Sequence, residues 1–167
     1  MKSNVWRVGA VLMCAAVLSG GCRTGGDEMA GESLIIEELE GDHRLMERFE
    51  DGTRVTDVSF DPVGFGYDSY QIDGSEVGKL NRVADYLRRA TDVNLVVEGH
   101  CDERGSREYN MSLGEHRALA VRAYLIGLGV DSARIQTRSF GEEQPMDMGH
   151  NDASWTRNRR GEFALYR

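Results

Sequence analysis

Strand-like and helix-like segments alternate along the chain from near Thr53 onward. Short apolar runs favour strands, and the longer segments between them place apolar residues at the three-and-four spacing of a helix. We expect strands at residues 54–60, 93–97, 135–140 and 161–166, and helices through residues 77–87, 108–128 and 152–158, with Asp73 and Ser75 as candidate caps of the first helix. This order predicts an α/β sandwich in which helices cover one or both faces of a mixed four-stranded sheet.

The N-terminal segment has the pattern of a targeting signal. Lys2 and Arg7 precede an apolar stretch at residues 8–18, and small residues follow, up to Cys22. The apolar stretch is too short to predict a membrane span. The run LSGGC at 18–22 resembles the lipobox of bacterial lipoproteins, which implies cleavage after residue 21 and lipidation of Cys22, with palmitate among the attached chains. The alternative is an ordinary secretory signal followed by an incidental cysteine.

Residues 22–52 are expected to be an acidic tether between the anchor and a domain at residues 53–167. The segment 23–52 carries ten acidic and three basic residues, which suits a solvated linker, although its apolar residues could line one side of a short helix. Removing the signal, with Lys2 and Arg7, would change the formal net charge from −8 to −10. Such a charge argues against nucleic acid as a partner, because binding to phosphates requires a basic face.

A candidate binding site follows the second predicted strand. The run GHCDERG occupies 99–105, and YNMSLGEHRALAV at 109–121 opens the long helix. Asn110, Leu113 and Arg117 are spaced so that they share one helix face. Arg117 therefore lies on or beside the apolar face, where a guanidinium needs an anion or several acceptors close by.

Asp102 follows the end of the strand, at the edge where α/β sheets commonly place ligands. A carboxylate and a guanidinium together suit a zwitterionic ligand. The competing interpretation is that Asp102 and Arg117 only pair with each other or cap nearby backbone groups.

The residues from about Thr53 onward resemble the OmpA-like peptidoglycan-binding domain family, in the version found in the branch of peptidoglycan-associated lipoproteins (Pal). The resemblance rests on GHCDERGSREYNMSLGEHRALAV at 99–121, SFGEEQP at 139–145, NRR at 158–160 and FDPVGFGYDSYQI at 60–72. It implies an outer-membrane lipoprotein that binds the diaminopimelate of the peptidoglycan stem peptide without a covalent bond. It also implies a place in the Tol-Pal envelope and cell-division system, with the periplasmic propeller protein TolB as a partner.

The resemblance also implies the ligand residues. Asp102 and Arg117 match the family positions that bind diaminopimelate. Asn110, Leu113 and, in the loop after the first strand, Phe60 and Asp61 match further contact positions. The NRR motif implies that one arginine among Arg157, Arg159 and Arg160 shapes the same cleft, and the sequence does not distinguish them.

Three other functions are compatible with parts of the sequence. His100, Asp102 and Ser106 could suggest a hydrolase, but no GxSxG-type turn accompanies them, so no enzymatic activity is expected. His100, Cys101, Asp102 and His116 are possible metal ligands that lack a recognised spacing, so neither a metal nor a cofactor is expected. The third alternative is a periplasmic interaction module for a TolB-type partner, with weak wall binding.

Overall fold

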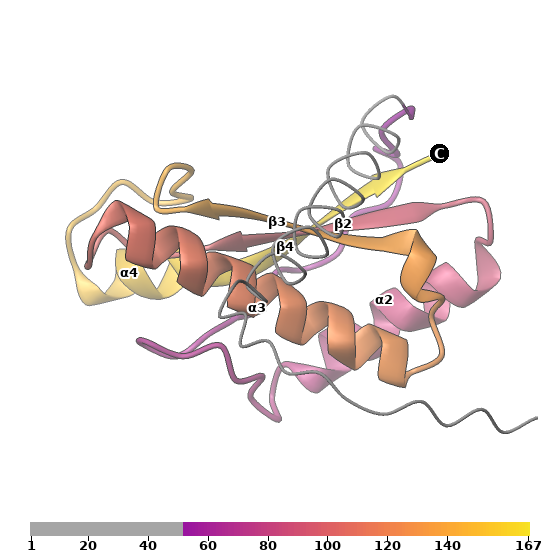
Figure 1. The fold of residues 1–167 in the computed structure, drawn as a ribbon, viewed down its shortest axis with the longest axis horizontal. Helices are drawn as coiled ribbons and strands as arrows, with labels where there is room; N and C mark the ends of the chain where they lie inside the picture. Colours follow the sequence, from indigo (N-terminus) through magenta and orange to yellow (C-terminus); the bar gives the residue numbers. More distant parts are fainter. Residues whose placement is uncertain (1–51) are drawn as a thin grey trace, which may run out of the picture.

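The computed structural model describes residues 52–167, and Figure 1 shows their arrangement. The signal, Cys22 and the tether up to residue 51 lie outside the described residues. The elements are β1 (Val63–Gly64), α2 (Val77–Arg89), β2 (Asn94–His100), α3 (Arg107–Gly127), the short 3-10 helix η1 (Ser132–Arg134), β3 (Ile135–Gly141), α4 (Asp152–Asn158) and β4 (Arg160–Tyr166). Both long helices and the last three strands lie within two residues of their expected bounds, apart from the C-terminal end of β2.

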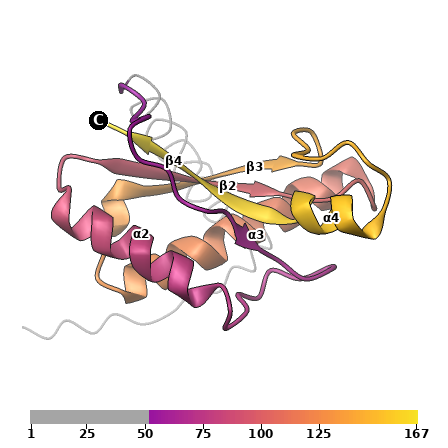
Figure 2. The ribbon, with the colours of Figure 1, turned by 180° about the vertical axis from the view of Figure 1, so that it is seen from behind.

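The strands form one four-stranded sheet in the order β1-β4-β2-β3. Strands β2 and β3 are parallel, whereas β4 runs antiparallel to both β1 and β2. Helices α2 and α3 lie on the same face of this sheet, as Figures 1 and 2 show from opposite sides. The mixed sheet with helices on one face confirms the predicted α/β sandwich.

The core lies between this sheet face and the two helices. Leu80 and Leu87 of α2, Val121 of α3 and Leu95 and Val97 of β2 are among its fully buried side chains. Burying an aliphatic side chain of this size contributes about 1.5–3 kcal/mol to folding. These apolar contacts hold α3 against the sheet and so fix the position of its first turns.

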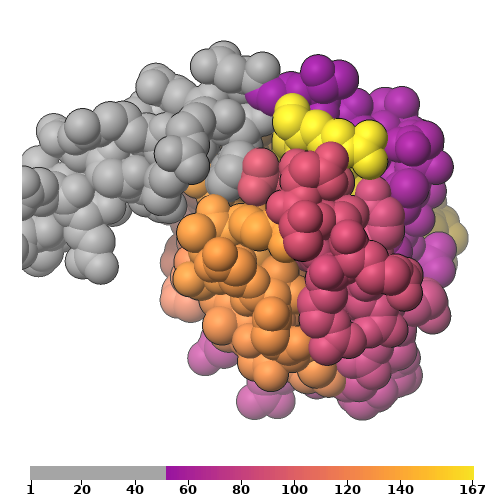
Figure 3. Space-filling view, turned by 90° about the vertical axis from the view of Figure 1, so that its right-hand side faces the viewer, coloured from indigo at the N-terminus to yellow at the C-terminus, as the bar shows by residue number. Residues whose placement is uncertain are grey.

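The expected first strand at residues 54–60 is wrong. Arg54 forms only an isolated bridge with Tyr166, and the first strand of the sheet is Val63–Gly64. The apolar residues Val55 and Val58 are three apart, so the segment lacks the two-residue alternation that a half-buried strand requires. The chain instead crosses beside the end of β4, where Val55 N donates to Leu165 O at 2.9 Å, and Figure 3 shows the two segments side by side.

Strand β2 is longer than expected, because it continues through Glu98 and Gly99 to His100. Gly99 is a point of close approach to α3, since a Cβ atom there would lie 1.9 Å from the Gly114 carbonyl oxygen. The glycine therefore lets the helix pack closely on the strand, and the strand delivers residues 101 and 102 to the start of α3.

Asp73 and Ser75 do not cap α2. The Asp73 carboxylate accepts hydrogen bonds from the Ser75 backbone N and hydroxyl, which builds a turn ahead of the helix. Helix α2 begins after Glu76, whose carboxylate accepts from Gly64 N at 2.6 Å. Glu76 thus ties the start of α2 to β1.

Candidate functional site

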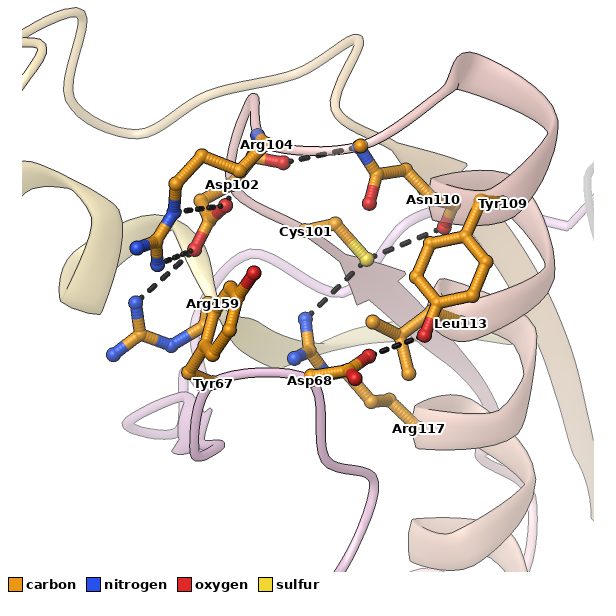
Figure 4. A pocket seen from close by; sticks show the side chains of 11 residues that line it. Tyr67, Asp68, Cys101, Asp102, Arg104, Tyr109, Asn110, Leu113, Arg117 and Arg159 are labelled. Atoms are coloured by element: carbon orange, nitrogen blue, oxygen red, sulfur yellow. Dashed lines mark hydrogen bonds and ion pairs between the residues drawn. The ribbon is translucent and has the colours of Figure 1, made fainter.

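A cavity of about 130 Å³ lies where β2 ends, between the loop at residues 67–68 and the first turns of α3 (Figure 4). We call it the strand-end pocket. Its lining residues are Tyr67, Asp68, Cys101, Asp102, Arg104, Gly105, Tyr109, Asn110, Leu113, Arg117 and Arg159. Four of the six residues that the sequence singled out for ligand binding are therefore brought together here.

Asp102 is the buried carboxylate of the pocket, with 4% of its surface exposed. Arg104 donates to it from the backbone N and Nε at 3.1 Å and from a terminal nitrogen at 2.7 Å, and Arg159 donates at 3.1 Å. Burial alone would raise the Asp102 pKa, but the bonds from Arg104 and Arg159 outweigh it and hold the pKa below its ordinary 3.8. Asp102 is therefore ionised at neutral pH.

Arg104 is held between two aromatic rings. Its guanidinium lies 4.2 Å from the ring centroids of both Tyr67 and Trp155, close enough for cation–π attraction. Its side chain is nevertheless about one-third exposed. Arg104 thus covers Asp102 from the solvent side.

Arg117 is almost completely buried, with 1% of its surface exposed. Its guanidinium donates to the carbonyl oxygens of Ser69 at 2.9 Å, His100 at 2.7 Å and Gly66 at 3.1 Å, and to the Cys101 sulfur at 3.3 Å. Burial lowers the Arg117 pKa, yet a guanidinium stays charged in proteins. Arg117 and Asp102 therefore do not pair with each other, whereas the backbone contacts offered by the competing interpretation are present at Arg117.

Asn110 and Leu113 lie on the same face of α3 as Arg117, as their spacing predicted, and Figure 4 shows all three around the pocket. The Asn110 amide donates to Asp102 O at 3.2 Å and to a Glu142 carboxylate oxygen at 2.5 Å. The backbone carbonyl oxygen of Asn110 accepts from the Cys101 thiol at 3.2 Å. Burial raises the pKa of this thiol to about 11, so Cys101 is a neutral wall of the pocket.

The loop before α2 supplies the other side of the pocket. Asp68 has a positive φ of 49°, which costs a non-glycine residue about 1 kcal/mol. The Tyr109 hydroxyl of α3 donates to the Asp68 carboxylate and so fixes this conformation. Tyr67 and Asp68 could not be predicted from the sequence, because an irregular loop has no periodicity to show which helix it meets. Tyr109 of α3 was missed for the same reason, since its partner lies in that loop.

Phe60 and Asp61 do not line the strand-end pocket. The Phe60 ring packs edge-on against Tyr86 at 5.6 Å and Phe163 at 6.3 Å between ring centroids, within the edge of the core. Asp61 is exposed and pairs with Arg82 at 3.3 Å. Because the first strand begins later than expected, the loop at the pocket is the one around Tyr67 instead.

Arg159 is the arginine of the NRR motif that reaches the pocket. Besides Asp102, it donates to Phe65 O at 3.1 Å and so ties the loop before α2 to the start of β4. Arg157 pairs with Asp147, and Arg160 pairs with Glu162. The choice among these residues depends on tertiary contacts that the motif alone does not contain.

The pocket carries an excess of positive charge in an acidic chain. Arg104, Arg117 and Arg159 face two carboxylates, Asp68 and Asp102, whereas the whole chain has a formal net charge of −8. A ligand carboxylate is attracted by the surplus cation, and a ligand ammonium by Asp102. The geometry therefore suits a small group that carries both charges.

The possible catalytic set is not assembled. The His100 ring stacks on Phe140 at 5.3 Å between centroids, and the Ser106 hydroxyl accepts from Tyr109 N as the cap of α3. Within residues 52–167, no hydrogen bond joins the side chains of His100, Asp102 and Ser106. The described residues therefore contain no triad at this position.

The possible metal set is also dispersed. His116 lies on the exposed side of α3, where its Nδ1 contacts Ser112 O at 2.9 Å and its ring lies beside Tyr70. It does not line the strand-end pocket with Cys101 and Asp102.

Among residues 52–167, none of the helices combines the length and apolar character needed to cross a membrane.

Comparisons with known proteins agree on one family. Residues 64–159 match the model of the OmpA family. A peptidoglycan-associated lipoprotein of Haemophilus influenzae is 44% identical over 115 residues, which cover 68% of this chain and 75% of the relative. A protein of the same name from Pseudomonas putida is 36% identical over 157 residues, covering 92% and 93% of the two chains.

Solved structures give the same result for the fold. The crystal structure of the peptidoglycan-associated lipoprotein from Burkholderia pseudomallei is 39% identical, with a TM-score of 0.61, and the match covers 62% of this chain and 88% of that one. The C-terminal domain of Helicobacter pylori MotB matches with a TM-score of 0.60 at 23% identity, over 64% and 84% of the chains. The second likeness concerns the fold alone.

Proposed function

Because the chain belongs to the OmpA family, in its branch of peptidoglycan-associated lipoproteins, we propose that it binds peptidoglycan without a covalent bond, through the strand-end pocket. The observation that carries the proposal is the buried, ionised Asp102 at the end of β2, which Arg104 and Arg159 bond directly and which shares the pocket with the Arg117 guanidinium. The ligand that fits is the free end of diaminopimelate, which presents an ammonium and a carboxylate on one carbon. The relatives are named as lipoproteins and not as enzymes, which supports the expectation of no enzymatic activity.

Binding would exchange one set of charged contacts for another. Asp102 already accepts four hydrogen bonds from Arg104 and Arg159, which is about as many as a carboxylate can take. A ligand ammonium would replace the side-chain bonds from Arg104. The displaced guanidinium, partly exposed between Tyr67 and Trp155, would then turn toward the ligand carboxylate and hold it by two parallel hydrogen bonds.

Arg117 would act differently from Arg104. Four of its five N–H groups are used by carbonyl oxygens and by Cys101, so it has little left for a fork onto the ligand. It contributes a buried positive charge near the ligand carboxylate and fixes the loop at Gly66 and Ser69. Asn110 and Leu113 complete the wall along α3. In this proposal Phe60 and Asp61 contribute nothing to the ligand.

The cellular role follows from the relatives and the N-terminal sequence. We propose that Cys22 carries lipid and anchors the chain in the outer membrane, with the domain in the periplasm and the acidic tether between them. One molecule would then join the outer membrane to the cell wall, within the Tol-Pal system during cell division.

Sedimentation of the full chain with purified sacculi tests the proposed function. Asp102→Ala should leave the protein in the supernatant, since it removes the buried carboxylate that the proposal assigns to the ligand ammonium. Asp61→Ala is the matched control, because Asp61 is an exposed aspartate outside the pocket, and it should sediment as the wild type does. Equal sedimentation of Asp102→Ala and wild type would refute the proposed site.

A protein partner at the same surface is a second candidate function. Tyr67, Tyr70 and Tyr109 are 64%, 52% and 50% exposed, and two of them line the pocket. Exposed tyrosines are enriched in protein interfaces. We propose that a TolB-type partner would cover this rim and compete with the wall, so that adding it should release the chain from sacculi. If the partner released the chain from sacculi without competing for the pocket, the partner and the wall would bind different surfaces.

A further inference from the structure

A second cluster of ionisable side chains lies on the sheet face turned away from α2 and α3. Glu98 and His100 are two residues apart in β2, so both point to that face, because Val97 and Leu95 point into the core. Glu162 of β4 is paired directly with Glu98. One candidate ligand atom from each of Glu98, His100 and Glu162 lies within 4.8 Å of the others. None of the three lines the strand-end pocket.

Besides the clustering of ligand atoms, the state of the His100 ring is a second, independent indication that a ligand binds here. The side chain is 1% exposed, yet neither Nδ1 nor Nε2 has a hydrogen-bond partner within residues 52–167. The backbone of Gln144 lies near enough to favour the charged ring slightly, but not in hydrogen-bonding geometry. The His100 ring stacks on Phe140, which covers one face of the ring but offers no hydrogen-bond partner to either nitrogen. A buried polar group left in this state is costly.

The charges around the cluster are formally balanced. Arg160 donates to one carboxylate oxygen of Glu162 at 2.5 Å, so the second oxygen of that carboxylate can serve another partner. Burial raises the pKa of Glu98, and the neighbouring Glu162 adds to this, whereas Arg54 and Arg160 oppose it. A metal ion would therefore be held by the three ligand atoms and by the unpartnered imidazole, and not by an excess of negative charge.

Burial also lowers the pKa of His100 to about 4, with the charge of Arg160 contributing. The imidazole is therefore neutral at neutral pH and keeps a lone pair on one nitrogen. Metal ions bind histidine in this neutral form, so no proton has to be displaced. The pKa only supports what the geometry already indicates.

We propose that Glu98, His100 and Glu162 form a binding site for a divalent transition-metal ion, with zinc as the best fit. One imidazole nitrogen and two carboxylate oxygens are ligands that Zn²⁺ accepts, and three protein ligands would leave a fourth position for water. Mg²⁺ and Ca²⁺ prefer sites built from oxygen alone, so the imidazole disfavours them.

A metal here would act on the pocket through the strand. It would join β2 to β4, and the backbone carbonyl of His100 accepts from Arg117 at 2.7 Å. The same residue thus offers its ring to the metal and its carbonyl to the buried guanidinium. The ion would fix the strand end from which Cys101 and Asp102 project, without touching the wall ligand.

The test uses the mature chain purified in detergent without a histidine tag and stripped with a chelator. Calorimetry with zinc should show one ion per chain, zinc should raise the unfolding temperature, and cobalt should give visible absorption bands of a nitrogen-containing site. Glu162→Gln should weaken zinc binding at least about tenfold. Its side chain is partly exposed, so this variant should fold even if a change at His100 does not.

The other histidines supply the matched control. Replacing His43, His116 and His150 by Gln leaves His100 as the single imidazole, and this triple variant should bind zinc as the wild type does. Adding His100→Gln should abolish the cobalt bands. The proposal is overturned if zinc up to about 100 µM gives no heat of binding. It is equally overturned if the triple variant loses the site, or if Glu162→Gln binds zinc as tightly as wild type.

Discussion

The apolar core and the strand-end pocket are both buried, but their chemistry is opposite. Leu80, Leu87 and Val121 bury hydrocarbon between the helices and the sheet, whereas the pocket buries Asp102 and Arg117. Burying hydrocarbon stabilises the fold, while a buried charge must first recover the cost of leaving water. The apolar contacts therefore stabilise the fold, and the pocket depends on the elements that these contacts hold in place. Substitutions in the core should therefore lower the free energy of unfolding, and substitutions in the pocket should weaken wall binding.

The largest expected effect is on the core side of this comparison. Leu87→Ala should lower the free energy of unfolding by about 2–5 kcal/mol, because the side chain is fully buried and leaves a cavity. Sacculus binding per folded molecule should not change. Leu119→Ala is the control, since Leu119 is 43% exposed, and it should shift stability by less than about 0.5 kcal/mol. Urea denaturation measures both variants, and weaker binding by folded Leu87→Ala would break the comparison.

Arg117→Lys should mainly weaken binding. A single ammonium keeps the buried charge but cannot reproduce the fork that bonds Gly66, Ser69 and His100, so the loop that lines the pocket loses the contacts that position it. The expected loss of affinity corresponds to about 1.5–3 kcal/mol, measured by calorimetry with a stem peptide. Arg122→Lys is the control on the same helix, because Arg122 bonds Ile135 O, away from the pocket. Equal affinity of Arg117→Lys and wild type would place Arg117 outside the binding site.

Tyr109→Phe should have a smaller effect. It removes the hydroxyl that holds Asp68 in its positive-φ conformation, which should cost about 0.5–1.5 kcal/mol of affinity and little stability. Tyr70→Phe removes an equally exposed hydroxyl that does not line the pocket, so it should bind as wild type does. If both variants lose affinity to the same extent, the rim as a whole is responsible and not the contact with Asp68.

Lowering the pH should have the smallest effect on sacculus binding. Arg104 and Arg159 depress the Asp102 pKa below 3.8, so its carboxylate contributes fully above that value and is lost only as the pH falls through the lowered pKa. Sacculus binding should therefore be constant from about pH 7 to about pH 5. A loss of binding centred between about pH 5 and 6 would point to a different titrating group.

The parts of the molecule that could be predicted from sequence are those with local periodicity. Helix α3 places Asn110, Leu113 and Arg117 on one face because residues three and seven apart must meet there. The first strand was misplaced because Val55 and Val58 do not alternate. Arg104 escaped prediction, and Arg159 could not be told from Arg157 and Arg160, because only the folded chain shows which arginines bond Asp102. The ligand role of every pocket residue stays a prediction.

Calorimetry with two stem peptides tests whether the strand-end pocket recognises a zwitterion. One peptide carries diaminopimelate at the third position, and the other carries lysine, which keeps the distal ammonium but lacks the distal carboxylate. We expect the full chain to bind the diaminopimelate peptide at least about tenfold more tightly, because only that peptide meets both Asp102 and the surplus guanidinium charge. Equal affinity for the two peptides would contradict recognition of a zwitterion in the strand-end pocket.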